Sequence, residues 1–239
     1  CEAEPGIAVV RNRALEFALA GFDFLAFLDD DELASERWLA ELARVQAATD
    51  ADAVIGPVTP EYPPHAPAWI AGGGFFELPT FEDGAAVEMG WTGNCLIRMA
   101  TVRRLGLRFN LSFGLTGGCD SLFFAELLRA GGSVRYAAHA DVREPVPSKR
   151  LTARYVLFRR VRIGNTLARC DRIVTPTPRA FVRRTILSSL TILSGLLRVG
   201  PLALRGGKRG AMFAARDVAA GLGVLAGLAG VVVTEYKRR

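Results

Sequence analysis

Three consecutive aspartates, Asp29, Asp30 and Asp31, stand directly after a short apolar run at 24–28. A run of this kind is typical of a strand buried on both faces of a mostly parallel sheet. Open α/β sheets bind ligands at the carboxyl ends of their strands, where these aspartates would lie. A hard divalent cation such as Mg²⁺ or Mn²⁺ would relieve their mutual repulsion and bridge to phosphates. An acidic loop that caps the next helix is the alternative.

The elements around the aspartates alternate between strand and helix, which indicates an α/β domain. Helical spacing covers 11–21, with Gly21 as a C-cap, and 36–48, with Ser35 as its N-cap. Residues 57–90 are rich in Pro and Gly, which predicts a long functional or mobile loop. The remaining expected elements are strands at 52–56, 91–98 and 134–138, short helices at 100–105 and 121–130, and a basic helix at 149–170.

Three motifs in this order resemble glycosyltransferase family 2, whose members have the GT-A fold. The segment RNRALEFALAGFDFLAFLDDDELASERWLAEL at 11–42 is similar to the family's ARN, FLD-x-D and WL pattern. WTGNCLIR at 91–98 resembles its G-x-N segment, and GLTGGCDSLFFAELLRAGG at 114–132 resembles its GG-E-D segment. The similarity covers about 1–170. It is nearest to bacterial exopolysaccharide glucosyltransferases of the succinoglycan type, which share the RRxRxGN-like helix at 159–165.

The resemblance implies a metal-dependent, inverting transfer of a sugar from a nucleotide sugar, expected to be a UDP-hexose. The expected acceptor is a glycan or a lipid-linked glycan. Asp29 would contact the nucleotide, and Asp29 and Asp31 would hold Mg²⁺ or Mn²⁺, with Asp30 among the donor-binding residues. Asp120 matches the family's general base, which removes the proton of the acceptor hydroxyl. Asp120 as a simple N-cap of the following helix is the alternative.

Other residues that match the family each have a structural alternative. Arg11 and Asn12 would contact nucleotide phosphate or cap their helix. Gly93 and Asn94 would line the donor-sugar pocket, where a glycine allows close backbone approach, or form a tight turn. Trp91 would stack on a sugar ring or pack in the core.

The chain also departs from the family pattern. The usual glutamate before the base is Cys119, which we place on the acceptor side with Arg159 and Arg162. The family's first strand, helix and second strand, which bind the nucleoside base, are expected ahead of residue 1. The Gln-x-x-Arg-Trp motif of processive synthases is missing from the sequence, which favours the addition of a single sugar.

Charge divides the chain into two parts. Residues 1–144 carry 11 basic and 21 acidic side chains, whereas residues 145–239 carry 19 basic and 3 acidic ones. A composition with 50% hydrophobic and 23% charged residues excludes a disordered chain. We expect an incomplete GT-A-type sheet flanked by helices at 1–147, a basic helix and linker at 148–178, and membrane-associated apolar or amphipathic helices at 179–239.

Two apolar stretches, 186–204 and 218–233, lie in the basic part. Cationic clusters precede, separate and follow them, which conflicts with the positive-inside rule for a two-span hairpin. We therefore expect shallow or re-entrant helices on an anionic leaflet, at the cytoplasmic face of the inner membrane. Spanning helices, or helices packed on protein, are the alternatives. No interleaving of aromatic and basic residues predicts nucleic-acid binding. A non-catalytic, membrane-bound assembly subunit degenerate from this family is the alternative function.

Overall fold

The computed structural model describes residues 6–234, and the chain divides into two compact units, which are treated separately. The first unit takes the chain as far as Glu61, with Phe76–Gly114 and Cys119–Pro145. The second takes Tyr62–Phe75, Leu115–Gly118 and the chain from Val146 onward. The expected domain boundaries at 147 and 178 stay a prediction.

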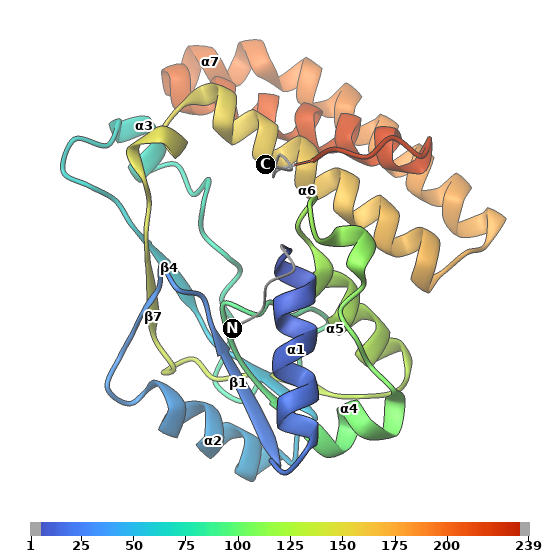
Figure 1. Cartoon of the computed structure of the whole chain (residues 1–239). Coiled ribbons are helices and arrows are strands. Elements are labelled where there is room, and N and C mark those ends of the chain that lie inside the picture. Colours follow the sequence, from blue (N-terminus) through green and yellow to red (C-terminus); the bar gives the residue numbers. More distant parts are fainter. Residues whose placement is uncertain (1–5, 235–239) are drawn as a thin grey trace. The chain divides into compact units, whose positions relative to one another are not determined.

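A four-stranded sheet forms the centre of the first unit (Figure 1). Its order is β1 (Phe24–Leu28), β5 (Asn94–Arg98), β3 (Ala53–Ile55) and β6 (Val134–Tyr136). β5 runs antiparallel to both β1 and β3, and β3 runs parallel to β6. Three of the four strands therefore point the same way, and the antiparallel β5 between β1 and β3 makes the sheet mixed.

Helices cover both faces of this sheet, which confirms the α/β class (Figure 1). α2 (Trp38–Thr49) packs Leu42 and Val45 against Val54 and Leu96 on one face. On the other face lie α1 (Ile7–Leu19), α4 (Met99–Leu105), the short 3-10 helix η1 (Leu111–Phe113) and α5 (Cys119–Arg129). Phe109 links this layer because it meets Phe27 of β1 edge-on and stacks on Phe123 of α5 at 4.6 Å.

A smaller three-stranded sheet stands beside the first and was not predicted. Its order is β2 (Leu33–Ala34), β7 (Val142–Pro145) and β4 (Val58–Glu61). β4 lies inside the segment expected to be a loop at 57–90, because that segment pairs in parallel with β7. The short helix α3 (Ala68–Ala71) also falls in that segment.

Three local predictions for the first unit were wrong. β1 is not buried on both faces: its two end residues are exposed, with Phe24 at 38%, and its middle residues are half-buried. It is also the edge strand of the described sheet. α2 begins at Trp38 with Arg37 at the cap position and no side-chain cap. The expected cap, Ser35, directly follows β2, and its N–H donates to the Asp141 carbonyl. α1 ends at Leu19, so the C-cap is Ala20 and not the expected Gly21.

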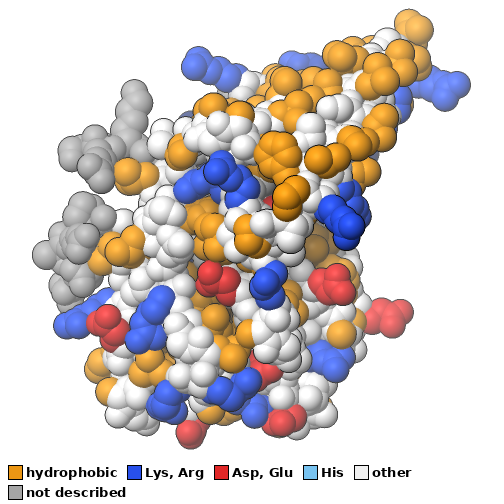
Figure 2. All heavy atoms as spheres, turned by 90° about the vertical axis from the view of Figure 1, so that its right-hand side faces the viewer, with side chains coloured by type: hydrophobic (Ala, Val, Ile, Leu, Met, Phe, Trp, Pro, Cys, Tyr) orange, Lys and Arg blue, Asp and Glu red, His pale blue; other side chains and the backbone are white. Residues whose placement is uncertain are grey.

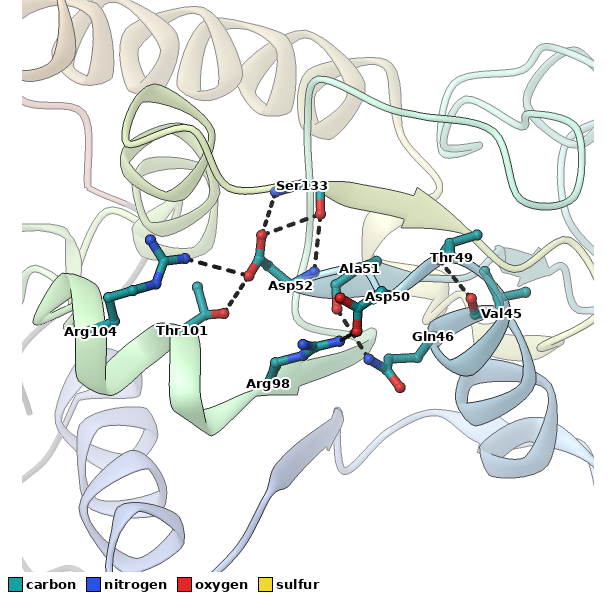
Figure 3. A network of polar contacts seen from close by, with 10 residues as sticks. All are labelled: Val45, Gln46, Thr49, Asp50, Ala51, Asp52, Arg98, Thr101, Arg104 and Ser133. Carbon is teal, nitrogen blue, oxygen red and sulfur yellow. Dashed lines mark hydrogen bonds and ion pairs between the residues drawn. The ribbon is translucent and has the colours of Figure 1, made fainter.

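A polar network closes the edge of the main sheet where β1 begins and β5 ends (Figure 3). The Asp52 carboxylate accepts hydrogen bonds from Thr101 and from the backbone N–H of Ser133, the latter at 2.8 Å. Arg104 lies 3.6 Å from the same carboxylate. Burial raises the pKa of Asp52, but these hydrogen bonds outweigh burial and lower it. The network ties β3, α4 and the start of β6 together at the end remote from Asp29.

The second unit consists mainly of helices (Figure 1). The 3-10 turn η2 (Ser148–Arg150) precedes α6 (Ala153–Val174), so the basic helix begins and ends later than the predicted 149–170. α7 (Pro178–Leu228) replaces the two separate apolar stretches expected at 186–204 and 218–233. Within α7, Gly207 has φ 54° and ψ −140°, so the chain changes direction there. We call 178–206 the outer arm and 208–228 the inner arm.

Candidate functional site

The candidate site lies at the carboxyl end of β1. Leu28 pairs with Asn94, so the aspartates after β1 emerge beside the start of β5. The neighbouring β3 ends at Ile55, and the N–H of Gly56 donates to the carbonyl of Asn94 at 3.1 Å. Sequence positions far apart therefore meet at one edge of the sheet, as expected for ligand sites in α/β folds.

Arg11 connects two of the predicted motifs. Its side chain is buried, and Nη2 donates to Asp29 Oδ1 at 3.2 Å. Its other terminal nitrogen, Nη1, donates to Cys119 Sγ at 3.3 Å. One guanidinium therefore holds the aspartates after β1 and the start of α5 in one arrangement. The alternative that Arg11 merely caps its helix is wrong, since it lies inside α1.

The charges in this cluster influence one another. Burial lowers the pKa of Arg11, but nearby Asp120, Cys119 and Asp29 outweigh burial and raise it. Burial raises the pKa of Asp29; Arg11 lowers it, and Asp120 and Asp31 raise it again. Burial also raises the pKa of the Cys119 thiol. The site is thus a buried cation among carboxyl groups, with the Cys119 thiol beside it.

Asp120 lies on α5 in the same unit as Asp29. It is the second residue of the helix, so it does not occupy the N-cap position. Its Oδ1 accepts a hydrogen bond from the Ser121 N–H at 2.8 Å, which fixes the carboxylate at the start of the helix. Asp120 is half-buried, and its carboxylate lies close enough to Asp29 to raise the pKa of Asp29.

Glu32 belongs to the site and was missed by the sequence analysis. Its carboxylate accepts the Asp29 N–H at 3.0 Å, and its own N–H donates to the Asp29 carbonyl at 3.2 Å. Burial, together with the nearby carboxylates of Asp29, Glu144 and Asp31, raises the pKa of Glu32 to about 8, although the hydrogen bond from the Asp29 N–H lowers it. In the sequence, the only signal for a role of Glu32 is its place in the acidic run. Its partial burial depends on contact with the segment at 91–94, which the sequence does not reveal.

Gly93 makes room for Glu32. A Cβ atom at residue 93 would lie 2.5 Å from Glu32 Oε1, which is closer than real contacts of this kind. The glycine therefore allows a carboxylate to rest against the backbone, as expected of a close approach. Thr92, next to it, is fully buried, and its hydroxyl has no hydrogen-bond partner among the described residues.

Asn94 holds this edge together from the inside. Its Nδ2 donates to the carbonyls of Pro57 and Ala140, and its Oδ1 accepts from Trp38 Nε1 at 2.8 Å. The side chain is fully buried, so the amide positions the site, and direct contact with a donor sugar stays a prediction. Trp91 is half-buried and donates from Nε1 to the Gly56 carbonyl at 3.0 Å.

Asn12 also acts within the protein rather than as a cap. Its amide donates to the Phe109 carbonyl and accepts the Phe109 N–H, both at 2.8 Å. Asp30 and Asp31 are exposed after β1. Arg159 and Arg162 lie on α6 in the second unit, where Arg159 donates to the Phe75 carbonyl at 3.0 Å. Their proposed contacts with an acceptor remain predictions.

The carboxylates present suit a divalent cation only as a partial ligand set. Among residues 6–234, no three His, Cys, Asp or Glu side chains converge into a metal cage. Mg²⁺ commonly takes one or two carboxylates and fills its other positions with water and substrate phosphates. The oxygen donors Asp29 and Asp31, beside the half-buried Glu32, fit that pattern.

The fold and the site define an α/β protein with an acidic cluster at a strand end of its main sheet. No protein-family model matches the chain. It is similar to the succinoglycan biosynthesis protein ExoM of Rhizobium meliloti (strain 1021), with 42% identity over 164 residues. The match covers 68% of this chain, which spans about half (52%) of ExoM. The predicted resemblance to succinoglycan-type exopolysaccharide proteins is thereby confirmed.

Two solved structures of TarS from S. aureus show a weak structural similarity to the chain. TarS 1–349 is 13% identical with a TM-score of 0.44, covering 90% of this chain and 70% of that one. The complex of TarS 1–349 with UDP-GlcNAc is 13% identical with a TM-score of 0.43, covering 95% and 72%. The α/β class is defined by the strands and helices of this chain itself.

Proposed function

We propose that the protein is a metal-dependent, inverting glycosyltransferase that moves a sugar from a nucleotide sugar to a glycan or lipid-linked glycan during polysaccharide biosynthesis. The observation that carries the proposal is the double contact of Arg11 with Asp29 and Cys119. It joins the aspartates after β1 to the helix that presents Asp120. The similarity to ExoM, a succinoglycan biosynthesis protein, supports a role in polysaccharide biosynthesis.

Each side chain has a role in this reaction. Asp120 removes the proton of the acceptor hydroxyl as that oxygen forms its bond to the anomeric carbon of the donor sugar. The bond from that carbon to the diphosphate breaks, its electron pair leaves with the diphosphate, and the configuration inverts. Arg11, buried beside Asp29, keeps the carboxylates oriented toward the donor. Asn94 and Gly93 shape the edge against which the sugar would rest.

Asp29 and Asp31 would hold Mg²⁺ or Mn²⁺ together with oxygens of the donor diphosphate. The bound cation supplies charge neutralisation for the leaving diphosphate. We expect a UDP-hexose as donor, because the family that the motifs resemble uses such donors. We also place the enzyme on an anionic membrane at the cytoplasmic face; the long apolar α7 supports the membrane association.

Asp120→Asn and Asp31→Ala test the assignment. Removal of a general base lowers turnover by about 10²–10⁴-fold, so Asp120→Asn should lose transfer while its thermal unfolding stays near that of the wild type. Glu126→Gln, a neutralisation further along α5, is the matched control and should retain activity. Wild-type turnover in both site variants would refute the assignment.

Calorimetry with UDP and Mn²⁺ separates the enzyme from the alternative, a non-catalytic assembly subunit. The enzyme should bind UDP in a metal-dependent manner, and Asp31→Ala should weaken that binding. A folded full-length protein that binds neither UDP nor Mn²⁺ would favour the assembly subunit instead.

A further inference from the structure

The two arms of α7 form an antiparallel hairpin. A Cβ at Gly210 would lie 2.0 Å from the carbonyl oxygen of Leu202, close to the turn. Further along, a Cβ at Gly221 would lie 3.0 Å from the carbonyl oxygen of Ser188. Arg198 and Asp217 bridge the arms at 2.9 Å between these points. The helix that is long and apolar enough to cross a membrane is therefore folded back on itself.

The inner arm is fixed to α6 by contacts that only glycine permits. A Cβ at Gly223 would lie 2.0 Å from the carbonyl oxygen of Val161, and one at Gly164 would lie 2.1 Å from that of Ala220. Ala168 of α6 packs with Val224 and Leu228 of the inner arm. The inner arm therefore lies directly on the backbone of α6, and most of its residues are buried or half-buried.

Insertion of α6 into the hydrocarbon core of a bilayer, together with the inner arm, would be strongly unfavourable. It carries six arginines and one aspartate within its 22 residues. Several of these, including Arg159, Arg160 and Arg162, neighbour the stretch that packs on the inner arm. Charged side chains at membrane depth are strongly unfavourable. A crossing of the bilayer by the hairpin would therefore require α6 to leave it.

The outer arm, in contrast to the inner arm, is mostly exposed. Of the window of α7 that could cross a membrane, only 11% is buried. Large apolar side chains recur every three or four residues along one side of the arm, and all are exposed: Val182, Ile186, Leu190, Leu193 and Leu197. This spacing marks one helix face. Figure 2 shows hydrophobic side chains gathered over the helices of this unit, with Lys and Arg among them.

The charges of the outer arm itself have a single sign, although Arg198 pairs with Asp217 of the inner arm. Residues 178–216 contain eight Lys and Arg and no Asp or Glu. Arg179 and Arg183 are exposed at the start of the outer arm, and Arg205, Lys208 and Arg209 are exposed at the turn. Both ends of the apolar face are therefore cationic, which complements an anionic lipid surface.

We propose that the outer arm is the membrane-docking surface of this protein: it lies flat in the headgroup region of an anionic bilayer while the inner arm clamps it to α6 and does not cross. The apolar face enters the acyl boundary, and the cations at both ends contact lipid phosphates. This inference specifies the membrane association in the proposed function and does not depend on sugar transfer.

Co-sedimentation of the full chain with vesicles tests the docking surface. Vesicles of phosphatidylcholine and phosphatidylglycerol in equal parts should bind the chain, and pure phosphatidylcholine vesicles should bind it more weakly. The double variant Ile186→Glu, Leu193→Glu should reduce binding by about tenfold or more, since two charges enter the apolar face. The matched control Leu39→Glu, Leu111→Glu alters two exposed leucines of the first unit and should bind like the wild type.

Three results would overturn the proposal. Equal binding by the outer-arm variant and the wild type, with circular dichroism showing both folded, excludes this face. A membrane-bound chain that resists extraction by alkaline carbonate would show that the hairpin spans. If the wild type is a dimer that does not bind vesicles, and the outer-arm variant is a monomer, the face would instead be the contact surface for a second copy. Loss of sugar transfer with vesicle binding intact counts against the proposed function alone.

Discussion

The carboxylate of Glu32 occupies the space that a side chain at Gly93 would need, with Oε1 2.5 Å from the position of a Cβ. The same carboxylate accepts the N–H of Asp29. The glycine after Trp91 and the acidic run after β1 thus form one packed unit, and each determines the shape of the other. The aspartates are positioned through this contact as well as through Arg11.

Gly93→Ala should displace Glu32 and disturb the aspartate turn. We expect turnover of the donor sugar to fall by about 100-fold, since misplacement of site groups by about 1 Å has effects of this size. In a Glu32→Ala background the added methyl group meets no carboxylate, so the same substitution should have little further effect. Steady-state kinetics of the four proteins measures this coupling, and strictly additive losses would contradict it.

Glu32 should make stability depend on pH. Its folded pKa of about 8 lies above its ordinary value of 4.5, so the folded state holds a proton that the unfolded state has lost between these values. The free energy of unfolding should therefore decrease as pH rises from about 4.5 to 8. Glu32→Gln removes this contribution. Urea unfolding across this range should show a flatter profile for Glu32→Gln, and identical profiles would be evidence against a buried proton.

Arg11→Lys should impair the site although it keeps the charge. The two terminal nitrogens of Arg11 reach Asp29 and Cys119, whereas one ammonium lacks this planar fork. We expect turnover to fall by about 100-fold. Arg13→Lys is the matched control, because Arg13 lies on the same helix with its side chain 68% exposed and pairs only with Glu16 among the residues described. Similar kinetics for the two variants would show that the double contact is unimportant.

Asp52→Asn should destabilise the protein by about 1–3 kcal/mol, because the new amide would face the donors of Ser133 and Thr101. Asp50→Asn is the comparison two residues away. Its side chain is 87% exposed and its pairing with Arg98 is a surface contact, so about 0.5 kcal/mol or less is expected. Urea unfolding at neutral pH measures both; equal losses would contradict the burial argument.

The contribution of Asp52 should also vanish in acid. Its folded pKa is lowered, so its stabilisation is complete above the unfolded value, which is near 4. It is lost as pH falls through the lower folded value. The difference in unfolding free energy between wild type and Asp52→Asn should therefore narrow as the pH is lowered below about 4. A difference that stays constant into strong acid would contradict this assignment.

The sequence by itself determined the α/β class, most helices and strands, and the position of Asp29–Asp31 at a strand end. These features depend on local periodicity and composition, which act over a few residues. The exposed edge of β1, the start of α2 and the strand β4 were predicted wrongly, because pairing between distant segments overrides local preference.

Only the tertiary structure decided how the site is held. Arg11 lies 108 residues from Cys119, and Asn94 lies 46 residues from Ala140. The burial of Glu32 depends on a glycine in another motif, and the folding of α7 into a hairpin depends on glycines of its inner arm that meet the backbone of its outer arm. Such contacts arise from the register of strands and the packing of helices. Spacing along the chain predicts which residues could do chemistry, whereas long-range packing selects which of them meet.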